Sequence, residues 1–266
     1  MNSRELDQFF TTKETAQQCI NFLRPLINLN DLSWIEPSAG SGIFLKQAKD
    51  MGFPTHAAAY DLMPQSVGVQ EIDFLKTDLS IVFKKPKDKL CLGNPPFGKN
   101  SSLAVKFFNH AAEHCNVIAM IFPATFAKES LQKKLNKYFH LVAELDLGAT
   151  PFNFVGELRN VPVVFQVWKK LDTERTLVKP KFTSKYFSFV TKEEAEFAIQ
   201  RVGGNAGRVK TDMSKLAKAS HYFIKAHRSD VKTTFEKIDW TSIKNKTAGN
   251  PSIAKTELIK ELEKLF

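Results

Sequence analysis

Short apolar runs alternate with amphipathic segments of helical length through the first two thirds of the chain. The runs that are typical of buried strands cover residues 34–36, 56–61, 90–93, 117–122, 141–147 and 161–168. Strands separated by helical segments build parallel sheets, so the pattern predicts a doubly wound α/β fold. The last two runs are too close in sequence for a helical crossover, and we therefore expect them to pair as an antiparallel hairpin at the end of the sheet.

The first helix is expected to begin at the polar residues 11–14. Thr11 would be its N-cap residue, and Glu14 would complete a capping box. Apolar residues then recur at helical spacing until Pro25, which ends the helix because proline lacks the backbone N–H that an internal turn requires. The predicted buried side consists of Ala16, Cys19, Ile20 and Leu23.

The composition of the chain changes after residue 170. Residues 171–266 hold 19 Lys and Arg against 12 Asp and Glu, a net charge of +7, whereas residues 1–170 hold 19 against 16, a net charge of +3. The basic part is rich enough in aromatic residues to form a core of its own. We therefore expect one domain over 1–170 and a small basic α+β region over 171–266, a candidate target-recognition domain. Its aromatic residues include Phe182, Tyr186, Phe187, Phe189, Phe197, Phe223, Phe235 and Trp240.

The whole chain carries 38 Lys and Arg against 28 Asp and Glu, a formal net charge of +10. This excess favours an acidic partner, either nucleic acid or a membrane surface. The longest apolar run, residues 117–122, stops at Pro123, far short of a bilayer span, and the chain starts without an apolar leader. These features predict a soluble intracellular protein that has no membrane partner.

Cysteine and histidine residues do not point to a metal site. Cys19, Cys91 and Cys115 are far apart and form no paired motif, so we expect reduced thiols that pack as small apolar side chains. The segment from His110 to His114 matches the H-x-x-E-H pattern of certain zinc proteases. This segment falls on a helix that covers the predicted sheet and does not line its ligand crevice. An ordinary surface helix is therefore the better interpretation, and no metal is expected.

The segment Glu36–Gly42, with the sequence EPSAGSG, follows the first strand and opens a helix. Glycines at this turn let the backbone approach a ligand, and the start of the helix offers unpaired N–H groups. The third glycine of the dinucleotide fingerprint is missing and the chain has no P-loop, which disfavours hydride transfer and nucleotide hydrolysis. Asp61 ends the second strand 19 residues after Gly42, where such folds place a ribose-binding carboxylate. A strand-end cap is the alternative role for Asp61.

The segment Asn94–Gly98, with the sequence NPPFG, stands at the exit of the strand 90–93. Loops at the carboxyl ends of strands hold the ligands in open α/β sheets, so this loop is expected at the same crevice as the glycine turn. The two prolines stiffen the loop, Asn94 offers an amide acceptor, and Phe97 offers a flat apolar face. Together these groups suit a planar ligand that carries an exocyclic amine; a rigid turn with a core phenylalanine is the alternative.

Four motifs in this order resemble the S-adenosylmethionine-dependent N6-adenine methyltransferases of nucleic acids, in the gamma-ordered subgroup with an NPPF motif. They are EPSAGSG at 36–42, DLM at 61–63, IDFL at 72–75 and NPPF at 94–97. Residues 8–12 are similar to the short N-terminal motif that lies across the cofactor in this subgroup, although Thr12 stands where the family has proline. The resemblance covers residues 8–168 and implies a seven-stranded, mostly parallel Rossmann-like methyltransferase sheet with a terminal antiparallel hairpin.

This resemblance also implies a cofactor, S-adenosylmethionine, which becomes S-adenosylhomocysteine, and a role for each matching residue. Asn94 and the Pro95 carbonyl would accept both N–H bonds of the adenine amine while Phe97 stacks on the base, which frees the nitrogen lone pair for attack on the methyl group. A target in a duplex would have to be flipped out. The implied catalytic residues are Asn94, Pro95, Pro96 and Phe97, and the implied cofactor-binding residues are Thr11, Glu36, Pro37, Ser38, Gly40, Gly42, Asp61, Asp73, Phe74 and Asn94.

Other substrate contacts follow from the expected topology. The connection 148–160 between the hairpin strands should emerge beside the NPPF loop, where its side chains either wall the target base or pack the hairpin turn. Lys99 follows the loop and could meet a phosphate group. The basic C-terminal region either tracks phosphates or serves as a stabilising extension. The candidate substrate-binding residues are Phe97, Lys99, Phe152, Phe154 and Arg159, whereas Lys84, Lys85, Lys87 and Lys89 are expected on a solvated face at the opposite edge.

The sequence thus predicts an N6-adenine methyltransferase that acts on DNA. An RNA adenine methyltransferase, including the cap-adenosine type, is the nearest alternative, because residues 160–168 also resemble a segment found there. A protein glutamine N5-methyltransferase is less consistent with Phe97 and with the basic C-terminal third. A cofactor-binding but inactive subunit that presents nucleic acid to a partner protein is the remaining alternative.

Overall fold

The structure is a computed structural model, and it describes residues 10–28, 32–54, 57–81, 88–154, 157–177, 179–247 and 250–266. The chain forms two compact units, Met1–Thr176 and Leu177–Phe266. The boundary between them falls shortly after the compositional change at residue 170.

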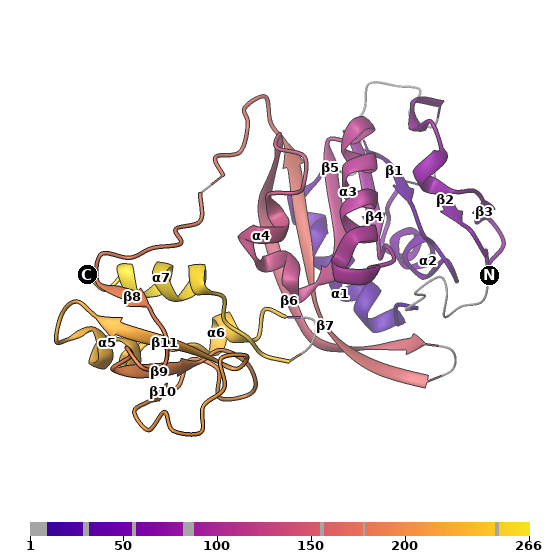
Figure 1. The fold of residues 1–266 in the computed structure, drawn as a ribbon. Helices are drawn as coiled ribbons and strands as arrows, with labels where there is room; N and C mark the ends of the chain where they lie inside the picture. Colours follow the sequence, from indigo (N-terminus) through magenta and orange to yellow (C-terminus); the bar gives the residue numbers. More distant parts are fainter. Residues whose placement is uncertain are drawn as a thin grey trace. The chain divides into compact units, whose positions relative to one another are not determined.

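The first unit is built on a seven-stranded sheet with the strand order β3-β2-β1-β4-β5-β7-β6 (Figure 1). The five strands β1 to β5 are mutually parallel, β7 is antiparallel to β5, and β6 is antiparallel to β7. This is the predicted Rossmann-like methyltransferase sheet with its terminal hairpin. The strands are β1 (Leu32–Glu36), β2 (Ala57–Asp61), β3 (Gln70–Glu71), β4 (Asp88–Gly93), β5 (Val117–Pro123), β6 (Phe139–Phe154) and β7 (Glu157–Lys170).

Helices cover both faces of this sheet. Alternate residues of β5 belong to two core clusters: Ile118 packs with residues of α3, and Ala119 packs with residues of α1 and α2. All seven residues of β5 are buried, as expected for a central strand between two helical layers. The helices and 3-10 turns of the unit are α1 (Lys13–Leu23), η1 (Arg24–Leu26), α2 (Ile43–Asp50), η3 (Phe74–Lys76), η4 (Leu79–Ile81), η5 (Lys99–Ser101), α3 (Ser102–His114), η6 (Ala124–Ala127) and α4 (Glu129–Gln132).

The start of α1 differs from the prediction by one residue. Thr12, not Thr11, is the N-cap residue, and its Oγ1 accepts the backbone N–H of Thr15 at 3.3 Å. The predicted capping box with Glu14 is therefore wrong, because Glu14 now stands one position too early to be the N3 residue. The shift leaves the hydroxyl of Thr11 outside the helix. The predicted apolar side of α1 is buried, and Pro25 lies in the 3-10 turn that follows the helix.

The terminal hairpin is longer than predicted. The sequence predicts a connection over 148–160, but β6 and β7 remain paired as far as Phe154 and Glu157, well past the end of β5. Gly148 does not begin the turn: it has φ +62° next to a register shift, and its N–H donates to Asp146 Oδ1. A glycine in the left-handed region at a β-bulge lets the strand continue with a changed twist.

The second unit is an α+β structure with an antiparallel sheet of order β10-β9-β11-β8. Its core contains Phe187, Phe197, Phe235, Trp240 and Ile259, so the basic C-terminal region has the predicted packed interior. The strands are β8 (Phe187–Phe189), β9 (Phe197–Gln200), β10 (Val209–Lys210) and β11 (His221–Ala226), and the helices are α5 (Val231–Lys237), α6 (Thr241–Lys244) and α7 (Lys255–Glu263).

Two further expectations concern the chain as a whole. Across the residues that the structure describes, every helix is too short or too polar to cross a lipid bilayer. Cys19, Cys91 and Cys115 are buried free thiols, each at most 2% exposed, and they pack in the two core clusters of the first unit. They therefore serve as the predicted small apolar side chains.

Candidate functional site

A cleft of about 250 Å³ opens where the carboxyl ends of β1, β2 and β4 meet. These parallel neighbours bring together loops that are far apart in the sequence, as open α/β sheets do at their ligand sites. Of the predicted site residues, those that line the cleft are Thr11, Glu36, Pro37, Ser38, Gly40, Asp61, Asp73, Phe74, Asn94, Pro95, Pro96 and Phe97.

Asp61 holds the glycine turn in shape. Its Oδ2 accepts the backbone N–H of Gly40 at 2.7 Å, and its Oδ1 accepts that of Met63 at 2.8 Å. Gly40 has φ +50°, and a Cβ on it would lie 2.9 Å from a ring carbon of Phe10. The turn therefore requires glycine at this position, and Asp61 lines the cleft with its oxygen atoms already oriented.

Gly42 shapes the turn without lining the cleft. It has φ +71° and is the N-cap residue of α2, and its N–H donates to the carbonyl of Ala39 at 2.7 Å. Gly42 thus directs the chain from β1 into α2, and its implied role as a cofactor-binding residue stays a prediction.

Glu36 is the most deeply buried acid of the site, with 1% of its surface exposed. Burial raises the pKa of Glu36 well above its ordinary value, and the negative charge of Asp61 raises this pKa further. The N–H of Leu45 donates to Oε2 at 3.0 Å, and this bond opposes the rise. The bond to Leu45 ties the end of β1 to the first turn of α2. Glu36 therefore lies at the base of the cleft as a carboxyl group that resists ionisation.

The NPPF loop is bound to two other segments of the cleft. The Ser38 hydroxyl donates to the backbone carbonyl of Asn94 at 2.8 Å, which joins the loop to the glycine turn. Asn94 Nδ2 donates to Thr11 Oγ1 at 3.1 Å, which joins the loop to the residue before the cap of α1. The side-chain amide of Asn94 is thus oriented by a residue 83 positions earlier in the chain.

The end of the NPPF loop is fixed to α3. The carbonyl of Phe97 accepts the N–H groups of Leu103 and Ala104 at 3.2 and 3.3 Å, two of the N–H groups in the first turn of this helix. Between Phe97 and Leu103, the residues Asn100 and Ser101 adopt the left-handed conformation, at φ 54° and 62°. Two such non-glycine residues in succession store backbone strain next to the proposed catalytic loop, a cost of roughly 1–2 kcal/mol each.

A short turn forms part of the wall of the cleft. Asp73 Oδ1 accepts the N–H of Leu75 at 3.1 Å, and Thr77 Oγ1 donates to the carbonyl of Asp73 at 2.8 Å. Phe74 is 2% exposed and its ring stacks on Phe107 of α3 at 5.2 Å. Asp73, Phe74 and Phe107 all line the cleft.

Several lining residues do not follow from the sequence reasoning. The sequence motif contains Phe10 but assigns it no role, and the amphipathic pattern of α3 puts Phe107 on the apolar side without indicating that it reaches a ligand site. Their apolar character is the only available signal, and core residues share it. The lining residues without a predicted role are Phe10, Ala39, Ser41, Leu62, Ile72 and Leu75, which lie within the recognised motifs, and Ile43, Phe44, Leu103 and Phe107, which lie outside them.

Two of the candidate substrate residues beyond the NPPF loop, Lys99 and Phe152, do not line the cleft. Lys99 is exposed in η5. Phe152 is completely buried in β6 and belongs to the core cluster that also contains Phe97, as the packing alternative predicts. The backbones of Phe154 and Arg159 lie in the hairpin, whereas their side chains lie outside the described residues. Of the four lysines expected on the opposite edge, Lys89 is half-buried as the second residue of β4. Lys84, Lys85 and Lys87 lie outside the described residues.

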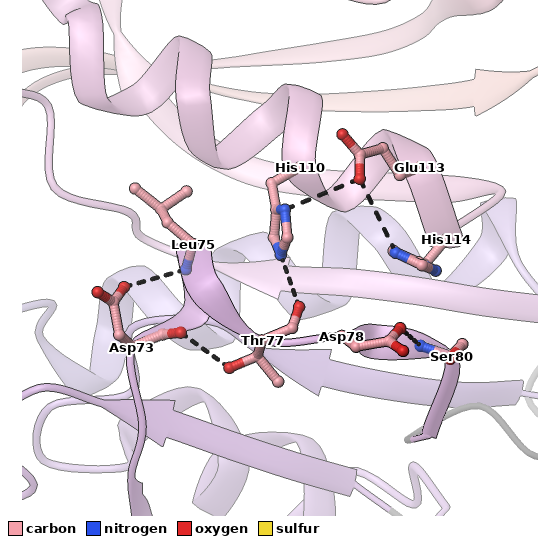
Figure 2. A network of polar contacts seen from close by, with 8 residues as sticks. All are labelled: Asp73, Leu75, Thr77, Asp78, Ser80, His110, Glu113 and His114. Carbon is pink, nitrogen blue, oxygen red and sulfur yellow. Dashed lines mark hydrogen bonds and ion pairs between the residues drawn. The ribbon is translucent and has the colours of Figure 1, made fainter.

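The two histidines of the H-x-x-E-H pattern lie on α3 beside the turn over residues 73–77, and not in the cleft (Figure 2). The ring centroids of His110 and His114 are 6.3 Å apart. Glu113 Oε2 lies 4.0 Å from Nδ1 of His110 and 3.9 Å from Nε2 of His114. Within the described ranges, no three His, Cys, Asp or Glu side chains converge as metal ligands.

Comparison with known proteins gives similarity of structure alone. No protein-family model and no curated protein matches the chain. A Pyrococcus horikoshii protein described as a candidate RNA methyltransferase aligns with 62% of this chain and 88% of its own, at 16% identity and a TM-score of 0.49. A candidate class I S-adenosylmethionine-dependent methyltransferase from Listeria monocytogenes covers 64% of each chain at 14% identity and a TM-score of 0.47. An Anabaena variabilis S-adenosylmethionine-dependent methyltransferase covers 62% of this chain and 87% of its own, at 10% identity and a TM-score of 0.42. The fold of this chain is assigned from its own strand order and register.

Proposed function

We propose that the chain is an S-adenosylmethionine-dependent methyltransferase that modifies the exocyclic amine of adenine in nucleic acid, with DNA as the preferred polymer. One observation carries the proposal: the glycine turn and the NPPF loop line one cleft and are joined by the bond from Ser38 to the Asn94 carbonyl. The proposed cofactor pocket and the two proposed amine acceptors would then belong to one site, as transfer between two bound molecules requires.

The cleft fits the cofactor in chemistry. Asp61 offers carboxylate oxygens that suit ribose hydroxyls, since each oxygen can accept more than the one backbone N–H that it already binds. The ring of Phe74 suits a flat nucleobase. Gly40 has no side chain, so the backbone of the turn can come close to an extended ligand. The volume of the cleft, about 250 Å³, lies just below the usual range for ligand pockets, about 300–1,000 Å³.

The resemblance to the methyltransferase family assigns the parts of the cleft. Glu36 and Ser38 lie at the turn that would hold the methionine portion, Asp61 would hold the ribose, and Asp73 with Phe74 would hold the adenine of the cofactor. When bound, S-adenosylmethionine supplies an electrophilic methyl group on a sulfonium that is a good leaving group.

Catalysis would then depend on how the NPPF loop binds the target amine. The nitrogen lone pair of adenine is conjugated into the ring, so the amine is a weak nucleophile. The Asn94 side-chain oxygen and the Pro95 carbonyl would accept its two N–H bonds, which draws the nitrogen toward tetrahedral geometry and exposes the lone pair. Phe97 would contact the face of the base. Preorganised acceptors of this kind lower the barrier without a metal or a covalent intermediate.

A nucleic acid as substrate is supported by the charge of the second unit. Residues 177–266 carry 18 Lys and Arg against 10 Asp and Glu, a net charge of +8. A unit with this net positive charge in the same chain as the cleft favours a polyanionic substrate over a protein substrate.

Labelled methyl transfer to matched oligomers tests the proposal. Single-stranded and duplex DNA and RNA with one adenine each are incubated with the protein and labelled S-adenosylmethionine, and the nucleosides are identified by mass spectrometry. The expected product is N6-methyldeoxyadenosine. Label found only in RNA would contradict the choice of polymer, and label that is released by protease but not by nuclease would indicate the glutamine alternative. Absence of transfer despite cofactor binding would favour the inactive-subunit alternative.

A further inference from the structure

His110 connects α3 to the turn over residues 73–77 (Figure 2). The turn and the helix are far apart in the sequence, because β4 and the NPPF loop lie between them. Its Nε2 lies 3.0 Å from the carbonyl oxygen of Thr77. A carbonyl can only accept, so Nε2 carries the proton of this bond. The side chain is 17% exposed, which shields the bond from competing water.

The turn that His110 holds is closed by its own hydrogen bonds. Thr77 donates to the Asp73 carbonyl through its hydroxyl, at 2.8 Å, and to the Phe74 carbonyl through its backbone N–H, at 3.2 Å. Leu75 donates to the Asp73 carboxylate. Because these bonds make the turn a small rigid unit, fixing Thr77 also fixes Asp73 and Phe74.

His110 also contacts Phe74 directly. The two rings meet edge to face, with centroids 4.9 Å apart and an interplanar angle of 87°. Phe107, one helical turn earlier, stacks on Phe74 with an interplanar angle of 23°. Two side chains of α3 therefore hold the Phe74 ring, and of these only Phe107 lines the cleft within the described part of the chain.

We propose that His110 is a positioning residue for the nucleobase end of the cofactor. It would act through the turn: by binding the Thr77 carbonyl and the Phe74 ring, it holds Asp73 and Phe74 in the arrangement that the ligand meets. This inference rests on the proposed function, since it takes the wall of residues 73–74 as the nucleobase site. It also gives the H-x-x-E-H segment a role, because Nε2 of His110 binds the carbonyl of Thr77.

His114 provides a matched control on the same helix. Its ring lies 3.9 Å from Glu113 and is 25% exposed, and it lies toward Asp78, outside the turn over residues 73–77. Replacing His114 alters the same sequence pattern and the same surface of α3 but leaves the bond to Thr77 in place.

The experiment uses His110→Leu, which removes the donor, His110→Gln, whose amide nitrogen can replace Nε2 as a donor, and His114→Leu. Two quantities are measured on the full-length protein: the Kd of S-adenosylhomocysteine by calorimetry, and amide hydrogen exchange at residues 75–77 without ligand. For His110→Leu we expect a Kd raised roughly tenfold, the effect of one lost hydrogen bond, together with faster exchange in the turn. His110→Gln should recover most of the affinity, and His114→Leu should match the wild type in both measurements.

The outcomes separate this inference from the function on which it rests. If the wild type does not bind S-adenosylhomocysteine, the proposed function fails and the cofactor role of His110 fails with it. If the wild type binds and His110→Leu binds equally well with unchanged exchange, only the role of His110 is overturned. Should His110→Leu not fold, His110→Asn takes its place, because its shorter amide cannot reach Thr77 and the same rise in Kd is expected. A kcat at saturating cofactor that stays within about twofold of the wild type distinguishes positioning of the cofactor from a general loss of structure.

Discussion

The hydroxyl of Ser38 donates to the backbone carbonyl of Asn94 at 2.8 Å. Ser38 belongs to the turn after β1 and Asn94 to the loop after β4, two neighbouring parallel strands. The bond therefore couples the part of the cleft that would hold the methyl donor to the part that would hold the methyl acceptor. Its geometry makes the alignment of the two loops a property of the folded protein before any ligand arrives.

Loss of this bond should impair turnover more than stability. For Ser38→Ala we expect kcat/KM to fall about tenfold, while the free energy of unfolding falls by about 1 kcal/mol, the usual net value of one hydrogen bond. Steady-state kinetics and urea unfolding measure the two effects. Ser33→Ala, at the other end of β1, is the control and should leave kcat/KM unchanged. An unimpaired Ser38→Ala enzyme would show that the loops align without this bond.

Thr11 and Thr12 should respond differently to the same substitution. Thr11 accepts from the amide of Asn94, whereas Thr12 caps α1. We expect Thr11→Val to lower kcat about tenfold with little change in stability, because the Asn94 amide loses the partner that orients it. Thr12→Val should instead lower the free energy of unfolding by about 1 kcal/mol and leave kcat nearly unchanged. Kinetics and unfolding of both variants, with Thr11→Ser as the rescue, measure this; equal effects on kcat would contradict it.

Gly98 should not tolerate a side chain. It has φ +68°, and a Cβ would lie 2.8 Å from Leu103 Cγ and 2.9 Å from the Leu103 backbone nitrogen. Gly98→Ala therefore combines a left-handed penalty with a clash against backbone, and we expect it to cost about 2–4 kcal/mol of unfolding free energy. Gly52 has φ +82° with nothing within 4 Å of its Cβ position, so Gly52→Ala isolates the conformational penalty at about 1 kcal/mol. Urea unfolding that gives equal losses for both variants would contradict the clash.

The buried carboxyl of Glu36 should make stability depend on pH. Its pKa in the folded protein is raised above the value in the unfolded chain, so between these two values the folded state binds more protons. Stability should therefore fall as pH rises from about 4.3 through the raised pKa, with a slope of up to about 1.4 kcal/mol per pH unit from this group. Glu36→Gln should lack this contribution, and its stability relative to the wild type should rise with pH. Urea unfolding of both proteins from pH 5 to pH 8 measures the difference; parallel curves would contradict the assignment.

The sequence predicts the part of the site that depends on strand order. Asn94 and Asp61 each follow an apolar run, and the rule that strand ends of a parallel sheet share one edge is enough to bring them to one cleft. The motif resemblance supplies their roles. Gly148 shows the opposite case: a glycine before Thr150 and Pro151 is typical of a turn, but a β-bulge uses the same conformation inside a strand.

The pattern of the sequence does not predict long-range contacts between elements of different kinds. The two exposed residues of β3 carry no hydrophobic signal, so this strand could not be predicted. The bonds from Asn94 to Thr11 and from His110 to Thr77 depend on how loops meet after the sheet has formed. Neither local propensity nor periodicity encodes such contacts, and for this reason the supporting residues of the cleft emerge only from the structure.

A structure of the protein with S-adenosylhomocysteine bound tests the central claim most directly. The account predicts that the ligand occupies the cleft between the glycine turn and the turn of residues 73–74, with its sulfur facing the side chain of Asn94 and the carbonyl of Pro95. A ligand bound elsewhere, or bound in the cleft with its sulfur turned away from the NPPF loop, would contradict the proposal that this cleft joins methyl donor and amine.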